Sequence, residues 1–493
     1  MNGRRSYALI LGGVCLAQAA VWVALAGLLE GSIRLDVAEG VVDGPQSRLS
    51  YLRHPPFSSW LTGLATHAGA LRYVAVYAIG LALSCGAFAL VALFMRRRAG
   101  ERAGWVALCA GLASPYATYV PLQVNHNIGV MPFWALVLAA AWSAFANRRL
   151  VDWALLGVAV GLGLWAKYAI LHLMVPLALY YLAALDWRRR ALAPGPWLAM
   201  AIALIVVAPH LIDVLANGAT TVRFASRTEA APLAARALWI GEFALDCALA
   251  QGAMAILAVA AGGRDALRAA LRPFADLRHA PALQRYLAVA AFGPVALVLS
   301  AALLGVRPHY LWLTPFALSF AAYWGFAASQ GEGAPSARLW RVFAALSFVA
   351  LAAYVGVREG APAFAARANY VEMDGPALAR LAQSYWAERH SGRIPFLVSL
   401  GLQHSFQAAG SIAFDLPYRV ETLEEGEPKN SPWFDVAALR ARGALVVSIA
   451  PIAPGTAILG GPIVDIERFD RPMMRGARSE AIYFGEVRGT SNP

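Results

Sequence analysis

Residues 33–69 read IRLDVAEGVVDGPQSRLSYLRHPPFSSWLTGLATHAG and form the first long polar interruption of a very apolar chain. The runs on either side, 8–29 and 73–95, are each long enough to cross a membrane as a helix, which takes about 20 apolar residues. Between them, Asp36 and Glu39 stand three positions apart, so one side of a helical turn carries both carboxylates. The stretch predicts a helical membrane protein with a polar loop suited to chemistry at one membrane face.

The second half of this loop predicts a turn followed by a short helix. Pro55 and Pro56 come after Arg53-His54 and exclude helix there, because proline lacks a backbone donor and restricts the residue before it. Beyond them, apolar side chains recur at helical spacing, at Phe57, Trp60, Leu61 and Leu64. This pattern favours an amphipathic helix lying in the membrane surface.

Composition places the whole chain in the membrane class. Of its 493 residues, 59% are hydrophobic and 14% charged, which is outside the range of an ordinary soluble domain. The net charge of +12 comes from arginines clustered between apolar runs, a distribution that indicates membrane orientation and argues against nucleic acid. All four cysteines fall inside apolar runs, so neither a disulfide framework nor a thiolate metal site is expected.

We expect a mainly α, polytopic bundle of about eleven spans, the first of them an uncleaved span rather than a signal peptide. The predicted ranges are 8–29, 73–95, 104–120, 128–146, 153–166, 169–185, 196–216, 238–261, 286–305, 310–328 and 340–357. Arginine clusters such as Arg96-Arg97-Arg98 and Arg188-Arg189-Arg190 lie at alternate span ends, which are predicted to be cytoplasmic. The N-terminus is then cytoplasmic, while the loop 30–72 and everything after Gly356 face the other side.

The tail predicts a separate small domain. From about Ala365 the charged fraction rises, and a helical pattern precedes several β-rich runs. These runs are 396–400, 444–449 and 481–484. We therefore expect a transmembrane domain over 1–360 and a C-terminal α/β domain over 361–493, outside the membrane.

Polar groups that are costly near a bilayer gather on the far side of this topology. They are Asp36, Glu39, Arg53, His54, Lys167, Arg223, Arg307 and His309. Lys167 lies between two apolar runs at an end where positive charge is disfavoured, which favours an anionic ligand or a carboxylate partner over anchoring. Arg307 has the same location. The set predicts a basic pocket with one or two acids, as a lipid phosphate requires.

The spacing from Asp36 through Tyr51 to His54-Pro55-Pro56 and Trp60 resembles the first outer loop of family-39-type glycosyltransferases. These are the protein mannosyltransferase-like group of integral-membrane (GT-C) enzymes, which includes the bacterial aminoarabinose transferase of lipid A. Further stretches match in the same order: NHNIGVMPFWALVLA from residue 125, GLGLWAKYAIL from 161, PHLIDVLANGATTVRF from 209 and RPHYLWLTPF from 307. The resemblance covers roughly residues 1–330 and implies a GT-C-like bundle.

The resemblance implies transfer of a sugar from a polyprenyl-phosphate donor to an acceptor hydroxyl at the periplasmic face of a bacterial inner membrane, with inversion. Lipid A, the lipopolysaccharide core or another envelope glycan would be the acceptor, and membrane lipids the remaining partners. Asp36 is then the expected catalytic base, with Glu39 beside it. The expected donor-phosphate ligands are Arg53, His54, Lys167, Arg307 and His309. Weaker expected substrate contacts are Tyr51, His126, Asn127, Tyr168 and Arg223. No cofactor is expected.

Three departures from the family pattern affect the predicted charge of the substrate and the expectation of a bound metal. Val37 stands where many relatives have a second acid, Asn127 stands at the second acidic position, and Arg53 replaces an acid before His-Pro-Pro. The changes favour a differently charged substrate, such as a uronic acid sugar, or impaired catalysis. A bound divalent metal is not expected, because the spacing of Asp36, Glu39 and His126 is not diagnostic of a metal site.

Two other functions stay open on the sequence alone. A transporter or flippase for a lipid-linked saccharide predicts an internal repeat and polar residues along a crossing path, of which Asp213, Glu242 and Asp246 are candidates. A non-catalytic homologue would bind lipid or a partner through its tail. The tail residues that would line an acceptor surface or pack in a core are Trp386, His390, His404 and Trp433.

Overall fold

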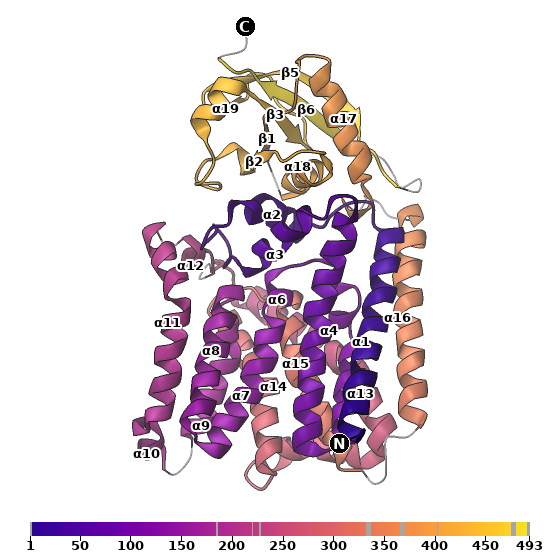
Figure 1. Ribbon diagram of the computed structural model, residues 1–493, viewed down its shortest axis with the longest axis vertical. Helices are drawn as coiled ribbons and strands as arrows, with labels where there is room; N and C mark the ends of the chain where they lie inside the picture. The colour runs from indigo at the N-terminus through magenta and orange to yellow at the C-terminus, as the bar shows by residue number, and fades with distance from the viewer. Residues whose placement is uncertain are drawn as a thin grey trace.

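The structure is a computed structural model that describes residues 2–183, 186–218, 220–225, 228–331, 337–364, 370–401, 403–474 and 480–490. A bundle of long helices occupies one half of the molecule, and a smaller domain built on a sheet caps one end of it (Figure 1). Two short helices of the first loop, α2 (Leu35–Asp43) and α3 (Phe57–Thr66), lie between the two parts.

The predicted spans correspond to helices. These are α1 (Asn2–Leu29), α4 (Arg72–Ala99), α5 (Glu101–Leu112), α7 (Met131–Asn147), α8 (Leu150–Ala166), α9 (Ile170–Leu182), α11 (Pro194–Ala216), α13 (Leu233–Ala275), α14 (Ala282–Leu303), α15 (Leu313–Ser329) and α16 (Ala337–Phe364). Within the described ranges, 8 helices are long and apolar enough to cross a membrane, and α8 and α9 are shorter apolar helices. The chain is therefore a multi-pass membrane protein, as predicted.

The predicted span 104–120 is wrong in its second half. Helix α5 ends at Leu112, and the chain continues through two 3-10 turns, η3 (Pro115–Ala117) and η4 (Val120–Leu122). Each turn contains a proline, which cannot donate the hydrogen bond that would continue an α-helix. The apolar side chains misled the prediction because here they face the protein interior rather than lipid.

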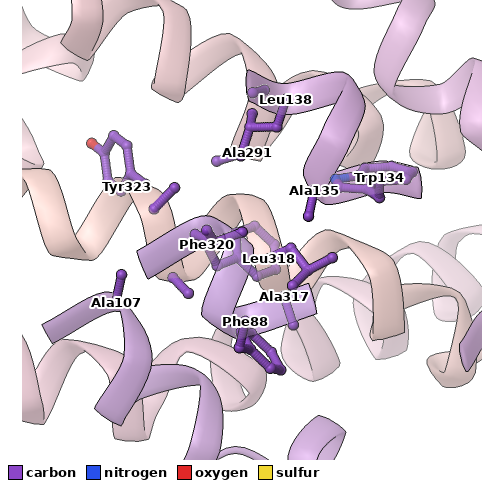
Figure 2. Packing of buried hydrophobic residues seen from close by; sticks show 14 of the residues in the cluster. Phe88, Ala107, Trp134, Ala135, Leu138, Ala291, Ala317, Leu318, Phe320 and Tyr323 are labelled. Atoms are coloured by element: carbon purple, nitrogen blue, oxygen red, sulfur yellow. The ribbon is translucent and has the colours of Figure 1, made fainter. Parts of the chain in front are cut away.

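Helix α15 forms the centre of the bundle, with 83% of its most apolar window buried inside the protein. Figure 2 shows Phe320 and Tyr323 of this helix packed among small and aromatic side chains of its neighbours, including Ala107 and Trp134. The Trp134 indole donates a hydrogen bond of 2.9 Å to Ser319, so these two buried polar groups are paired. This close-packed core is the rigid base on which the loops stand.

The first loop is folded back on itself. The turn η1 (Gly44–Gln46) follows α2, and a Cβ added to Gly44 would meet the Ser59 carbonyl oxygen at 2.1 Å. Helix α3 forms as predicted, but its buried face carries Ser58, Ser59 and Thr62, while Leu64 is 66% exposed. Small side chains take the buried face because α2 approaches so closely.

The C-terminal domain is an α/β unit. Its elements are α17 (Gly375–Ala387), β1 (Phe396–Ser399), α18 (Gln403–Asp415), β2 (Glu421–Leu423), η7 (Glu424–Gly426), α19 (Val436–Arg442), β3 (Ala444–Ser448), β4 (Ala457–Ile458), β5 (Gly461–Asp470) and β6 (Ala481–Val487). The sheet order is β2-β1-β3-β6-β5-β4, with β2, β1 and β3 parallel and the remaining pairs antiparallel. The predicted β-rich runs are β1, β3 and β6; the composition change near Ala365 lies outside the described residues.

Helix α18 docks this domain on the first loop. Its Gly410 packs against Ala38 of α2, where an added Cβ would come within 2.6 Å of the alanine Cβ. Gln407 donates to the Ile33 carbonyl at 2.9 Å, and the Ser411 and Ser32 hydroxyls are 2.8 Å apart. The position of α2 is thus fixed from both sides, by α3 and by α18.

Candidate active site

Asp36 lies in the first turn of α2 and accepts a hydrogen bond from Asn125. The Asn125 Nδ2 to Asp36 Oδ2 distance is 2.9 Å. Asn125 is the N-cap of α6 (His126–Gly129), and its Oδ1 accepts from the backbone amides of Asn127 and Ile128, both at 3.0 Å. Because the cap occupies the amide oxygen, the NH2 group is directed at the carboxylate. The capping turn thereby fixes the orientation of Asp36.

Lys167 is held by the same turn. It follows the last residue of α8 with an extended backbone, φ −167° and ψ 138°, and its ammonium donates to Asn127 Oδ1 at 2.6 Å. Asp36 and Lys167, far apart in sequence, thus bond to two different asparagines of the same turn. Asp36 bonds to Asn125, the N-cap of α6, and Lys167 bonds to Asn127 inside that helix. Sequence reasoning identified Asp36, Asn127 and Lys167 but missed Asn125, although an Asn immediately before a short helix is a capping signal.

The His54 and His126 rings lie beside this pair, tilted by 35° to each other, with ring centroids 4.1 Å apart. Burial lowers the pKa of His54 well below its usual value, and the neighbouring His126, Lys167 and Arg53 lower it further. A neutral imidazole can donate one hydrogen bond to a phosphate but does not add a positive charge. Among the expected phosphate ligands, the cationic role at this point falls to Lys167.

The residues best placed to hold a metal ion in the described ranges are Glu39, His54 and His126. Their ligand atoms lie within 4.8 Å of one another. One carboxylate and two imidazoles are a donor set that suits zinc, with a further coordination position left for water or substrate. The sequence named Asp36 rather than His54 in such a set, and the expectation that no metal is used stays a prediction.

Arg53 is paired with the C-terminal domain. Its guanidinium forms an ion pair with Glu424, which follows β2. Beside this pair, the Tyr51 ring meets Trp433 edge-on, with centroids 5.6 Å apart. Sequence reasoning could not find Glu424, because 371 positions separate it from Arg53.

Carboxylates outnumber cations around Arg53. Burial raises the pKa of Glu39 to about 7; Arg53 opposes this shift, and Asp36 and Glu424 add to it. Burial also raises the pKa of Asp43 well above its usual value, again with Glu39 and Glu424 contributing. Proton uptake by Glu39 therefore occurs near neutral pH, and Arg53 is engaged by protein carboxylates.

Arg307 and His309 line a neighbouring polar cavity of about 380 Å³ together with Trp239 and the carboxylates of Glu229, Glu242 and Asp246. The Arg307 guanidinium lies 5.6 Å from the Trp239 ring centroid. Burial lowers the pKa of His309, and the charges of Asp36 and Lys167 also act on it. Glu242 and Asp246, first considered as parts of a crossing path, gather here at one end of the bundle.

The remaining predicted residues have structural contacts. Tyr168 bonds to His210 at 2.8 Å, and the other nitrogen of His210 bonds to the Leu49 carbonyl at 2.7 Å, which ties α11 to the first loop. Tyr51 is buried, and its hydroxyl accepts from a backbone amide. Arg223 is exposed on α12 (Thr220–Ala225), and its guanidinium turns back to the Gly218 carbonyl. Of the predicted residues, Asp36, Asn127 and Lys167 thus gather at α6, whereas Tyr51, Tyr168 and Arg223 bond to other partners.

Comparison with known proteins gives a family match over part of the chain and a shared fold. Residues 53–212 match the dolichyl-phosphate-mannose-protein mannosyltransferase family. The lipopolysaccharide core galacturonosyltransferase RgtA of Rhizobium johnstonii is 27% identical over 317 residues, 62% of either chain, so the match spans less than two thirds of that relative. ArnT of Cupriavidus metallidurans, solved bound to undecaprenyl phosphate, has 15% identity and a TM-score of 0.61 over 99% of both chains. Its apo state gives the same TM-score over 98% of both.

The chain shares the GT-C fold of ArnT, and residues 53–212 match the mannosyltransferase family, in agreement with the resemblance seen in the sequence. More particularly, the segment that matches the mannosyltransferase family is the one that carries Arg53, His54, Asn125 and Lys167. Asp36 precedes that segment and joins it through Asn125.

Proposed function

We propose that this chain transfers a sugar from a polyprenyl-phosphate donor to a hydroxyl of lipid A, the lipopolysaccharide core or another envelope glycan. The observation that carries the proposal is the pair of hydrogen bonds at α6, Asn125 to Asp36 and Lys167 to Asn127. It sets a proton acceptor and a cation side by side, as an inverting transfer from a lipid phosphate requires. The relative RgtA, named for lipopolysaccharide core, supports the choice of acceptor.

In the proposed reaction the acceptor oxygen attacks the anomeric carbon while the bond from that carbon to the phosphate oxygen breaks. Asp36 accepts the hydroxyl proton through its free carboxylate oxygen, since the other oxygen is bonded to Asn125. Polyprenyl phosphate leaves with an added negative charge. Lys167 stabilises that charge, and His54 donates one hydrogen bond to it. Attack opposite to the leaving group inverts the anomeric centre.

We propose a uronic acid as the transferred sugar. The cavity beside the centre offers Trp239 for a sugar face, Arg307 for a sugar carboxylate, and Glu242 and Asp246 as acceptors for sugar hydroxyls. The name of RgtA, a galacturonosyltransferase, supports the same choice. The arginines in the last turn of α4 and in α10 (Trp187–Leu192) lie away from the C-terminal domain (Figure 1). They support a cytoplasmic N-terminus and a site on the periplasmic face of the inner membrane.

The test is transfer by the purified full-length chain, reconstituted in lipid with polyprenyl-phosphate galacturonic acid, mannose or aminoarabinose and a lipopolysaccharide acceptor. The expected product is an acceptor heavier by one uronic acid residue, detected by mass spectrometry. Transfer of a neutral sugar alone would refute the proposed donor. Absence of transfer with every donor would favour the flippase or the non-catalytic homologue.

A further inference from the structure

A larger cavity, of about 670 Å³, lies between the first loop and the C-terminal domain. The end of α2, η1 and α3 form one wall, and Ala413, Phe414 and residues 416–420, at the end of α18 and after it, form the other. Two contacts hold the second wall in place: Arg72 donates to the Phe414 carbonyl, and Tyr73 donates to Asp415 at 2.8 Å. The cavity is thus built jointly by the two parts of the protein.

The chemistry of this cavity is cationic and aromatic. Arg72, Arg419 and His67 line it, and no Asp or Glu is among the described lining residues. Arg419 and His67 are both exposed, so their side chains are accessible to a ligand. Trp60 and Tyr418 add aromatic surface. Cations and aromatic rings without a carboxylate suit a saccharide that carries phosphate or carboxylate groups.

The rim of the cavity is apolar on the side of the bundle. Leu64, at the end of α3, is 66% exposed, and Leu71, in η2 (Gly69–Leu71), is 63% exposed. The apolar span that includes α4 starts at Gly69, so these leucines lie at the end of a membrane-crossing segment. A cationic cavity above exposed leucines at a bilayer edge matches a ligand with an anionic head and acyl chains.

This cavity also adjoins the Asp36 centre. The Trp60 ring lines it and lies 5.4 Å from the Trp165 ring, two residues before Lys167. Helix α2 supplies Val42 to the cavity wall and carries Asp36 six residues earlier, a distance of roughly 9 Å along a helix at 1.5 Å per residue. One or two sugar units would bridge that distance.

We propose that the cavity binds the anionic headgroup of a membrane glycolipid and is the acceptor site of the transfer proposed above, on which this inference rests. The acyl chains lie against Leu64 and Leu71, and the phosphate or carboxylate groups pair with Arg419 and His67. A headgroup held there extends its terminal hydroxyl along α2 toward Asp36.

The experiment measures binding without donor, by native mass spectrometry of the full-length protein. The probes are bisphosphorylated lipid A, its dephosphorylated form, and the deacylated bisphosphorylated glycan. Wild type is compared with Arg419→Glu and with the matched control Arg468→Glu, whose arginine is 61% exposed on β5 of the same domain. We expect Arg419→Glu and removal of the phosphates each to weaken binding at least tenfold, with the control unchanged.

Equal affinity of Arg419→Glu and wild type for bisphosphorylated lipid A would overturn the site. Equal affinity for the deacylated glycan and the intact lipid would overturn the role of the leucine rim. Transfer is measured separately on the same preparations. If binding follows the expected pattern but no donor supports transfer, the site stands and the proposed function fails. If transfer proceeds and Arg419→Glu changes neither binding nor KM for the acceptor, the proposed function stands and the site fails.

Discussion

Asn125 permits a clean separation of stability from activity. It caps α6 through its side-chain oxygen and orients Asp36 through its nitrogen. Asn125→Ser keeps a capping oxygen and deletes the donor to Asp36, and Asn125→Asp keeps the cap but places a second carboxylate against the first. Since Asn, Asp and Ser cap about equally well, thermal unfolding should change little in either variant.

The expected loss of activity follows from the deleted hydrogen bond. A hydrogen bond to a charged group contributes about 1.5–3 kcal/mol, which corresponds to roughly 10- to 150-fold in rate if the bond is needed in the transition state. Asn125→Ser should therefore lower kcat at least about tenfold. Asn125→Asp should lower it further, because two carboxylates in contact disfavour ionisation of the base. The assay is sugar transfer at saturating donor.

The control for this pair is Asn127→Ser, which disturbs the partner of Lys167 and should raise KM for the donor more than it changes the response to pH. Unchanged kcat in Asn125→Ser, with the melting temperature unchanged, would show that the contact with Asp36 plays no part in the reaction. A large drop in melting temperature in both Asn125 variants would instead assign the residue a purely structural role.

Three further predictions concern the surroundings of Arg53. Burial raises the pKa of Glu39 to about 7 from 4.5, so the folded chain binds this proton more tightly than the unfolded chain. Protonated Glu39 therefore stabilises the folded state fully below pH 4.5, and this stabilisation is lost as the pH rises through 7. Glu39→Gln should then flatten the fall of melting temperature between pH 5 and 8, and an unaltered slope would exclude Glu39 as its source. Breaking the Arg53–Glu424 pair by Glu424→Gln should cost less than the roughly 3 kcal/mol of an uncompensated buried charge, because Glu39 and Asp43 still face Arg53. The swap of Arg53→Glu with Glu424→Arg should recover part of the loss in a double-mutant cycle. EDTA should leave transfer intact. If EDTA instead stops transfer, if added zinc restores it, and if zinc fails to restore it in His54→Ala, a metal would be assigned to Glu39, His54 and His126.

Apolar runs, arginine clusters and spaced prolines were enough to predict the bundle, the short helix α3 and the strands β1, β3 and β6. The strand β5 was missed because its side chains alternate in burial without a continuous apolar run. The ending of α5 at Leu112 was missed because the following apolar residues fill protein interior. In each case, tertiary packing rather than local pattern decided the outcome.

The candidate site was predictable only in part. Asp36, His54 and Lys167 stand out because charged groups near apolar spans are costly. Their partners do not: Asn125 resembles any loop amide, and Glu424 reaches Arg53 only because α18 docks on α2. Contacts between distant segments depend on the fold, so the sequence can indicate the members of a site and leave their pairing open.

The most direct test of the account compares Asp36→Asn with wild type in single-turnover transfer from polyprenyl-phosphate galacturonic acid, with donor binding measured on the same samples. Asparagine keeps the size of the side chain but cannot accept a proton. The account predicts donor binding within about threefold of wild type and transfer slower by at least 1,000-fold, a barrier increase of roughly 4 kcal/mol. Equal transfer rates in the two proteins would contradict the role of Asp36 as the base.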